Sequence, residues 1–260
     1  MRDGTNTLRD GLRKLSSASG GNRRVLLIGA GGLGSPAGLA LARAGIASIT
    51  LVDDDVVDAT NLHRQTLYTE DDVGSHKGPA AARRIAAEAR LAGHAVEVDV
   101  VHGRATPSTV MDLVARHDVV LEGADNFATK FLLADATAIA GVPVVQAGAV
   151  RWNGWALASV PGESACLRCV FEDIPRARAE TCAEAGVVGP VVGVLGAVQA
   201  ALALRLLRGD GDAAGVLFGY RGLDGSLRRS RVRRRPGCPL CTGEIDDLRL
   251  DRYAGPDCAA

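Results

Sequence analysis

The stretch Val25-Leu-Leu-Ile-Gly29-Ala-Gly31-Gly32-Leu-Gly34-Ser35 decides the fold of this chain of 260 residues. It begins with a short apolar run, residues 24–28, which is typical of a strand buried on both faces. Helical apolar spacing then covers residues 34–44. Glycines let the chain turn tightly and let a phosphate approach without interference from a Cβ atom, and a helix N-terminus offers unpaired N–H groups. The stretch therefore predicts a nucleotide site whose glycines are Gly29, Gly31, Gly32 and Gly34.

Further strands and helices alternate along the chain. We expect strands at residues 48–52, 96–101, 119–122 and 142–147, and helices at 76–92, 108–115 and 127–140. Such alternation predicts an α/β, Rossmann-like fold with a mainly parallel sheet, right-handed crossovers and helices on both faces. Beyond residue 147 the pattern changes, and residues 156–160 and 216–232 read as antiparallel strands around a long apolar helix.

Composition narrows the class of protein. Thirty basic and thirty acidic side chains leave no net charge, which argues against a nucleic-acid partner. Residues 1–22 are polar, with a short helix expected at 8–15, and show no signal peptide. We therefore expect a cytoplasmic protein with one domain over residues 23–245 and a tail at 246–260.

The apolar run at 187–204 is about long enough to cross a bilayer. Pro190, Gln199 and three glycines interrupt it, so a buried core helix or a subunit-contact helix is the preferred interpretation, and no membrane partner is expected.

Charged residues after the glycine loop point to a triphosphate. Asp53 follows about 20 residues on, where an acid conventionally holds ribose hydroxyls. Arg64 and Lys77 then suit the neutralisation of charge on an α-phosphate and a leaving pyrophosphate. The plainer alternative is that Arg64 pairs with Asp53 or Asp55 and that Lys77 is a solvated helix residue. The glycine loop alone would favour a dinucleotide oxidoreductase.

Asp125 and Asn126 follow the strand expected at 119–122, at the sheet edge where open α/β folds bind ligands. A carboxylate there can hold Mg²⁺. The alternative is that one of the two residues only caps the next helix.

Two C-x-x-C pairs stand about 70 residues apart. Together they predict a closed, structural Zn²⁺ site with four thiolate ligands, although either pair alone could be a redox motif. The ligands are Cys166, Cys169, Cys238 and Cys241. Cys182 lies outside both pairs, where a buried small hydrophobic residue and a reactive thiolate are both open interpretations.

These motifs resemble the ThiF/MoeB/HesA branch of the ubiquitin-activating-like adenylyltransferases over residues 23–245. The resemblance rests on the glycine loop and on Asp53-Asp-Asp55, Asn61-Leu-His-Arg64-Gln65-Thr-Leu67, Gly74-Ser-His-Lys77 and Asp125-Asn126-Phe-Ala-Thr129-Lys-Phe. It implies that Asp53 holds the ribose of ATP and that Asp125 serves Mg²⁺ and catalysis. It also implies phosphate contacts from Asn61, Arg64 and Lys77, with Asp55 and Asn126 in the same nucleotide-binding set. The Cys₄ zinc, a homodimer and a covalent bond from Cys182 to the substrate are further implications, the last of them left open.

The reaction implied is adenylation of the C-terminal glycine carboxylate of a small ubiquitin-like or sulfur-carrier protein, which releases pyrophosphate and prepares a thiocarboxylate. The family's N-terminal Arg-Tyr-x-Arg-Gln segment is not found here, so Arg9 and Arg13 are only candidates for its arginine. The chain has no room for a rhodanese domain, so we expect a separate sulfur donor. An NAD-dependent oxidoreductase and an inactive scaffold for a ubiquitin-like protein remain as alternatives.

The arginine-rich run at 228–235 has no interleaved aromatic residues. We interpret it as an exposed strand beside the zinc site, and a docking surface for an acidic carrier is the minority interpretation.

Overall fold

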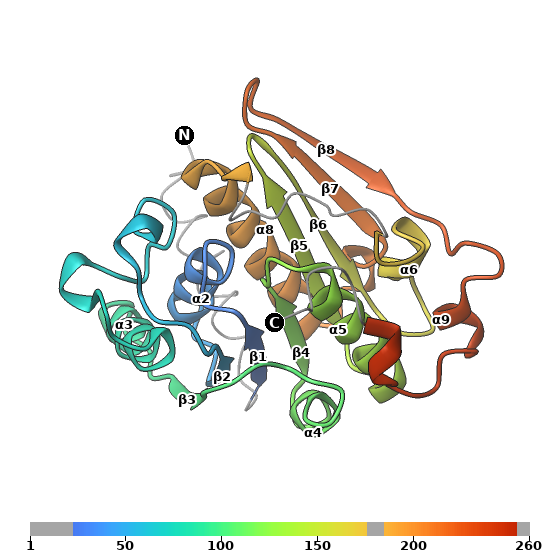
Figure 1. Ribbon diagram of the computed structural model, residues 1–260, viewed down its shortest axis with the longest axis horizontal. Helices are drawn as coiled ribbons and strands as arrows, with labels where there is room; N and C mark the ends of the chain where they lie inside the picture. Colours follow the sequence, from blue (N-terminus) through green and yellow to red (C-terminus); the bar gives the residue numbers. More distant parts are fainter. Residues whose placement is uncertain (1–22, 176–184, 254–260) are drawn as a thin grey trace, which may run out of the picture.

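The computed structural model describes residues 23–175 and 185–253, and these contain one eight-stranded mixed sheet in the order β3-β2-β1-β4-β5-β6-β7-β8 (Figure 1). The strands are β1 (Arg24–Ile28), β2 (Ser48–Val52), β3 (Glu97–Val101), β4 (Val119–Glu122), β5 (Val144–Val150), β6 (Asn153–Ser159), β7 (Val216–Arg221) and β8 (Ser226–Arg231). The main helices are α2 (Gly34–Arg43), α3 (Lys77–Leu91), α4 (Val110–Val114), α5 (Phe127–Ala140), α6 (Leu167–Val170), α8 (Gly189–Leu207) and α9 (Pro239–Thr242). The prediction of an α/β fold with a mainly parallel first half is confirmed.

The parallel half of the sheet determines which of its edges can bind a ligand. β1 pairs in parallel with β2 on one side and β4 on the other, and β5 continues the parallel series beyond β4. β2 and β4 are buried at every position, as the continuous apolar runs predict, whereas the edge strand β3 alternates between exposed and half-buried residues. The carboxyl ends of β1, β2 and β4 therefore meet at one edge, and the loops that follow them lie together.

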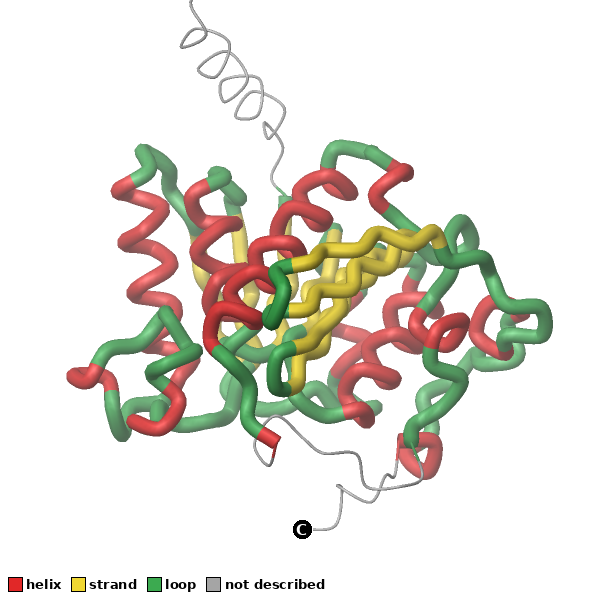
Figure 2. The backbone as a smooth tube through the Cα atoms, turned by 90° about the horizontal axis from the view of Figure 1, so that it is seen from above, coloured by secondary structure: helices red, strands yellow, loops and turns green. Residues whose placement is uncertain are grey.

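Helices cover both faces of the sheet (Figure 2). One core cluster packs α2, α3 and α8 against the sheet, and the second packs α4, α5, α6 and the C-terminal 3₁₀ helix Leu250–Tyr253 against the other face. Tyr253 is buried, so part of the segment expected to be a tail packs against the domain. The helix expected at residues 8–15 lies outside the described residues.

The second half of the sheet is antiparallel. β5 and β6 form a tight hairpin in which Gly148 pairs with Trp155, and β7 and β8 extend the sheet from β6. β5 continues to Val150 and β6 begins at Asn153, so both strands reach further toward the hairpin turn than the sequence predicts. This extra length carries Trp155 toward the ligand-binding edge.

The long apolar helix α8 belongs to the core. By length and composition it would be able to span a membrane. It packs instead against α2, β4, β5 and β6. Its Gln199 is 1% exposed and donates hydrogen bonds to the carbonyls of Glu122 (2.8 Å) and Val145 (3.2 Å). Close contact with α2 requires glycine at 196, where a Cβ atom would lie 2.5 Å from the carbonyl oxygen of Leu33.

Candidate active site

The glycine loop joins β1 to α2 and is held by three contacts to Ala30. The Ala30 N–H donates to Asp53 Oδ2 (2.7 Å), and the Ala30 carbonyl accepts from the hydroxyls of Tyr68 (3.0 Å) and Ser35 (3.1 Å). Gly34 is required for closure of the loop, because a Cβ atom there would lie 1.9 Å from the Gly29 carbonyl oxygen. The sequence thus forms a rigid turn at the N-terminus of α2, as expected for an anion-binding loop.

A cavity of about 620 Å³ opens above this loop. A volume in this range suits a nucleotide-sized ligand. Nine residues from the predicted site line it, and they come from five separate segments: Gly29, Gly31, Gly32, Asp53, Asp55, Arg64, Lys77, Asp125 and Asn126. The structure therefore brings together the glycine turn, both cations and the acids that the sequence singles out. Of the predicted nucleotide-binding residues that the structure describes, Gly34 and Asn61 do not line the cavity: Gly34 is buried at the start of α2, and Asn61 contacts Arg64.

The two cations differ in how they are held. The Lys77 side chain is 6% exposed and its Nζ lies 2.8 Å from Asp55 Oδ2, so it is not a solvated helix residue. Arg64 donates from Nη2 to Asn61 Oδ1 (2.5 Å) and from Nη1 to the Thr60 carbonyl (3.4 Å). Within the described residues, the structure gives Arg64 no carboxylate partner, and so the alternative of a pair with Asp53 or Asp55 is wrong.

Asp53 supports the loop from the end of β2. Its Oδ1 accepts the Asp55 N–H (2.9 Å) while Oδ2 accepts the Ala30 N–H. Burial raises the pKa of the Asp53 carboxyl above its ordinary 3.8, against the lowering effect of these two N–H donors and of Lys77. The ionised carboxylate retains lone pairs for further donors, as a ribose hydroxyl would require.

Asp125 and Asn126 have separate positions at the start of α5. Asn126 caps the helix, because its Oδ1 accepts the Thr129 N–H at 2.8 Å. Both residues line the cavity. The capping alternative is therefore correct for Asn126. Asp125 lines the cavity and does not cap the helix.

Several lining residues are not among the sequence-predicted ligands. Arg104 donates from Nε to Asp54 Oδ2 (2.7 Å). Lys130 is 5% exposed and bonds Glu122, which is fully buried at the end of β4. Trp155 packs against Phe171 and also lines the cavity. Lys130 follows Thr129 in the motif that begins at Asp125, and this motif is the sequence signal that could have placed it at the site. Arg104 stands in a segment without any motif.

Gln65 is a further lining residue with an unusual environment. Its side chain is 4% exposed, and its Oε1 atom has no hydrogen-bond partner within the described residues. Buried polar atoms are normally satisfied, so an acceptor left free at the wall of a cavity is consistent with a donor supplied by a ligand or by water.

The four paired cysteines meet at one point, where α6 approaches α9. Their sulfur atoms lie 3.7 Å (Cys166–Cys169), 3.6 Å (Cys166–Cys238) and 3.5 Å (Cys169–Cys241) apart. A tetrahedral zinc site with Zn–S bonds of about 2.3 Å separates its sulfur atoms by about 3.8 Å. The redox alternative applies to either C-x-x-C pair alone, whereas here the two pairs meet in one cluster of four sulfur atoms. The donor set and spacing fit zinc.

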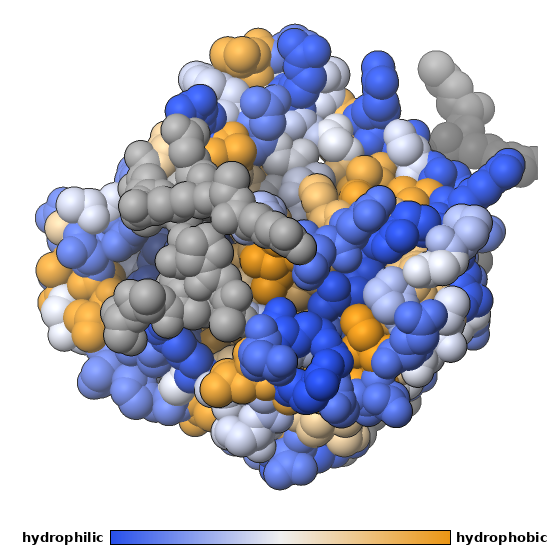
Figure 3. Space-filling model, turned by 45° about the vertical axis from the view of Figure 1, so that its right-hand side comes forward, coloured by the Kyte–Doolittle hydropathy of each residue, from blue (hydrophilic) through white to orange (hydrophobic). Residues whose placement is uncertain are grey.

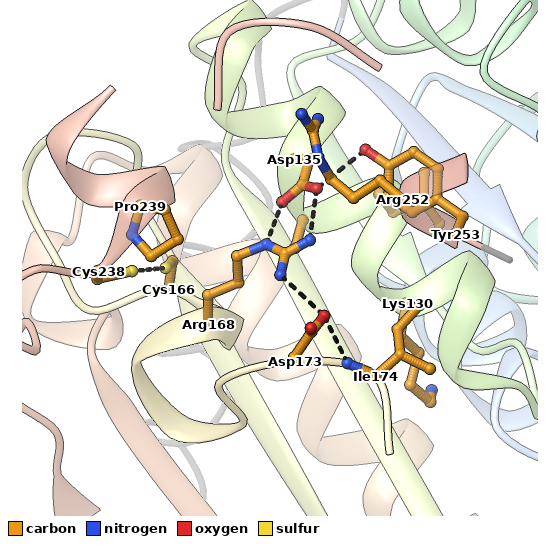
Figure 4. Close-up of polar contacts among 12 residues, drawn as sticks. Lys130, Asp135, Cys166, Arg168, Asp173, Ile174, Cys238, Pro239, Arg252 and Tyr253 are labelled. Atoms are coloured by element: carbon orange, nitrogen blue, oxygen red, sulfur yellow. Dashed lines mark hydrogen bonds and ion pairs between the residues drawn. The ribbon is translucent and has the colours of Figure 1, made fainter. Parts of the chain in front are cut away.

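Arg168 ties this cluster to α5 (Figure 4). It lies between Cys166 and Cys169, is 3% exposed, and makes two bonds of 2.8 Å to the Asp135 carboxylate. The Tyr253 hydroxyl donates to the same carboxylate at 2.9 Å. The guanidinium also stacks 4.7 Å from the Phe131 ring centroid. Cys182, the other cysteine of interest, lies outside the described residues.

The arginine-rich run forms β8 and the segment that follows it. All six residues of β8 are exposed, and the surface on this side of the molecule is mainly hydrophilic (Figure 3). Arg234 donates to the carbonyls of Gly162 (3.0 Å) and Cys241 (2.7 Å), beside the cysteine cluster. The prediction of an exposed strand is confirmed for residues 228–231, and residues 232–235 continue as a loop beside the cysteine cluster.

Comparison with known families agrees with this geometry: the ThiF family model matches residues 8–240. The chain belongs to the ThiF family. The SAMP-activating enzyme E1 of Haloferax volcanii is 38% identical over 228 residues, which cover 86% of this chain and 83% of that relative. The sulfur carrier protein ThiS adenylyltransferase of Escherichia coli is 38% identical over 239 residues, with 92% and 91% covered. These relatives confirm the prediction of an adenylyltransferase.

Some ThiF-family relatives are longer. The adenylyltransferase and sulfurtransferase MOCS3 of Sus scrofa is 40% identical over 94% of this chain, but the match covers 52% of that relative. Among solved structures, Escherichia coli MccB with MccA-N7isoASN has a TM-score of 0.74 at 22% identity and covers 88% of this chain and 69% of that one. The MccB likeness supports the fold.

Proposed function

We propose that this protein uses ATP to adenylate the C-terminal glycine carboxylate of a small ubiquitin-like or sulfur-carrier protein. The single observation that carries the proposal is the convergence of Arg64, Lys77 and Asp125 on the cavity above the glycine loop. Two cations beside an acidic cluster are poorly motivated for a hydride-transfer site, but they suit a triphosphate and its metal ion.

In this reaction a carboxylate oxygen of the carrier bonds to the α-phosphorus of ATP while the bond from that phosphorus to the bridging oxygen breaks. The products are an acyl-adenylate and pyrophosphate. The attacking carboxylate needs no general base, because it is already ionised at neutral pH. Catalysis therefore comes from alignment and charge stabilisation.

The lining residues take the following roles in the proposal. Arg64, oriented by Asn61, and Lys77, oriented by Asp55, contact the phosphates. Asp53 receives the ribose hydroxyls. Asp125 would hold Mg²⁺, which neutralises phosphate charge when it is bound.

The cysteine cluster has a structural role in the proposal. Zinc bound by the four thiolates would join α6 to α9, and the site has no open position for chemistry in a four-coordinate S₄ geometry. We further propose that the protein acts as a homodimer, as its resemblance to the family implies, and that a separate donor supplies sulfur to the adenylate. A covalent role for Cys182 and a partner-subunit role for Arg9 or Arg13 stay predictions.

Carrier-dependent ATP–pyrophosphate exchange tests the proposal. A β-grasp carrier that ends in Gly-Gly should support exchange, whereas the same carrier without its last two residues should not. Mass spectrometry of the carrier should show an added adenylate. A change in nicotinamide absorbance with no pyrophosphate released would instead support the oxidoreductase, and carrier binding without adenylate would support the scaffold.

A further inference from the structure

Two oppositely charged residues are buried beneath the turn that carries Asp125. Glu122, the last residue of β4, is 0% exposed, and Lys130, in the second turn of α5, is 5% exposed. The lysine Nζ lies 3.1 Å from Glu122 Oε1 and 3.0 Å from Oε2. The pair therefore spans the loop between β4 and α5 from below.

The contacts of this pair hold the loop from several sides. Glu122 Oε1 also accepts the Ala124 N–H at 2.6 Å, which fixes the residue directly before Asp125. Lys130 Nζ donates in addition to the carbonyl of Ala147 on β5. The loop is thus fastened to the strands β4 and β5 by two buried charged side chains.

The backbones of the same two residues are also held. The Glu122 carbonyl accepts from Gln199 of α8 (2.8 Å), and the Lys130 carbonyl accepts from Gln146 of β5 (2.8 Å). Gly123 packs tightly against the glycine loop, because a Cβ atom there would lie 3.3 Å from the Gly34 nitrogen. Movement of the Asp125 turn is therefore restricted relative to the phosphate-binding loop.

The stability of the fold does not by itself explain why two charged residues are buried here. Burial raises the pKa of the Glu122 carboxyl, and Lys130 acts in the opposite direction. Apolar residues of similar volume often replace a buried ion pair with no loss of stability. Lys130 lies at the wall of the ligand cavity, and its partner Glu122 fixes the residue next to Asp125, so the pair calls for a functional explanation.

We propose that Glu122 and Lys130 are positioning residues that hold the Asp125 turn in the geometry needed for metal-bound nucleotide. The inference rests on the proposed function and deepens it, because it assigns the preorganisation of Asp125 to a pair outside the predicted ligand set. In this proposal neither residue touches the reacting atoms. They orient Asp125 indirectly, through the Ala124 N–H and the start of α5.

The deciding variant is the double substitution Glu122→Leu with Lys130→Met. It removes both charges together, so neither is left unpaired in the core, and it should fold with a melting temperature within about 5 °C of the wild type. We expect carrier-dependent exchange to fall at least about 10-fold and the Mg²⁺ concentration for half-maximal rate to rise. Binding of ATP in the presence of EDTA should stay within about 2-fold of wild type, because the glycine loop is intact.

Single variants complete the test. Lys130→Arg keeps the charge and should retain more activity than Lys130→Met, which leaves Glu122 buried without its partner. A folded double variant with wild-type exchange and wild-type Mg²⁺ dependence would overturn the positioning role. A double variant that does not fold would also overturn it, since the pair would then serve stability. Wild-type protein without exchange would count against the proposed function instead.

Discussion

Substitution of Gly31 by alanine should separate ligand binding from folding. A Cβ atom at this position would lie 3.7 Å from Gln65 Nε2, which is ordinary van der Waals contact, so the protein itself has room for it. The new methyl group would nevertheless occupy the surface of the loop that lines the cavity, where a phosphate must approach the backbone. We therefore expect a folded protein that binds ATP poorly.

The expected size follows from the contacts that the phosphate would lose. A hydrogen bond to a charged group contributes about 1.5–3 kcal/mol, so loss of one such bond should weaken ATP binding about 10- to 150-fold. Isothermal titration calorimetry with ATP and Mg²⁺ measures this change, and thermal unfolding without ligand measures stability. Wild-type affinity in Gly31→Ala would refute the assignment of this loop to the phosphates.

Two matched glycines provide the controls for this experiment. Gly34→Ala should destabilise the protein, because its Cβ atom would lie 1.9 Å from the Gly29 carbonyl oxygen, and overpacking of this kind costs about 1–3 kcal/mol or more. Gly193→Ala meets nothing within 4 Å and lies inside α8, so it should stabilise the fold by about 0.5–1 kcal/mol and leave ATP binding unchanged.

Three further predictions follow from the charged groups and the cysteines. Lys77→Met should lower carrier-dependent exchange at least about 100-fold, whereas Arg83→Met, which removes an exposed charge from the same helix, should leave the rate within about 2-fold of wild type. Because burial raises the pKa of Asp53 above 3.8, ATP affinity should fall as the pH decreases through that raised pKa, and calorimetry on Asp53→Asn should show little of this pH dependence. Purified protein should contain close to one zinc per chain by atomic emission, and Cys238→Ser should lower both the zinc content and the melting temperature; full zinc content in that variant would contradict the ligand assignment.

The sequence predicts the parts of the site that rest on local chemistry. The glycine loop, the acid at the end of β2 and the two C-x-x-C knuckles each depend on residues close together in the chain, and the structure places them as expected. Asn126 also follows a local rule, since a side-chain oxygen at this position commonly caps a helix.

Glu122 and Lys130 illustrate what local reasoning misses. The two residues are eight positions apart, and this spacing brings no pair of side chains together within one helix or strand. They meet only because α5 folds back over the end of β4. Trp155 is missed for a similar reason: its position at the cavity depends on the register of the β5–β6 hairpin, which Gly148 accommodates opposite the indole ring.

Helix α5 connects the features that the sequence presents separately. Its N-terminus follows Asp125, its second turn carries Lys130 under the cavity, and its next turns carry Asp135 to the Arg168 guanidinium of the cysteine knuckle. An arginine held by both carboxylate oxygens permits little rotation, because a shift of either partner lengthens two charge-assisted bonds together. The cysteine cluster is therefore held, through Arg168, against α5, and the start of this helix follows the candidate Mg²⁺ ligand Asp125. The Arg168–Asp135 pair therefore holds α5 from the side of the cysteine cluster, while the Glu122–Lys130 pair holds the start of the same helix against β4 and β5.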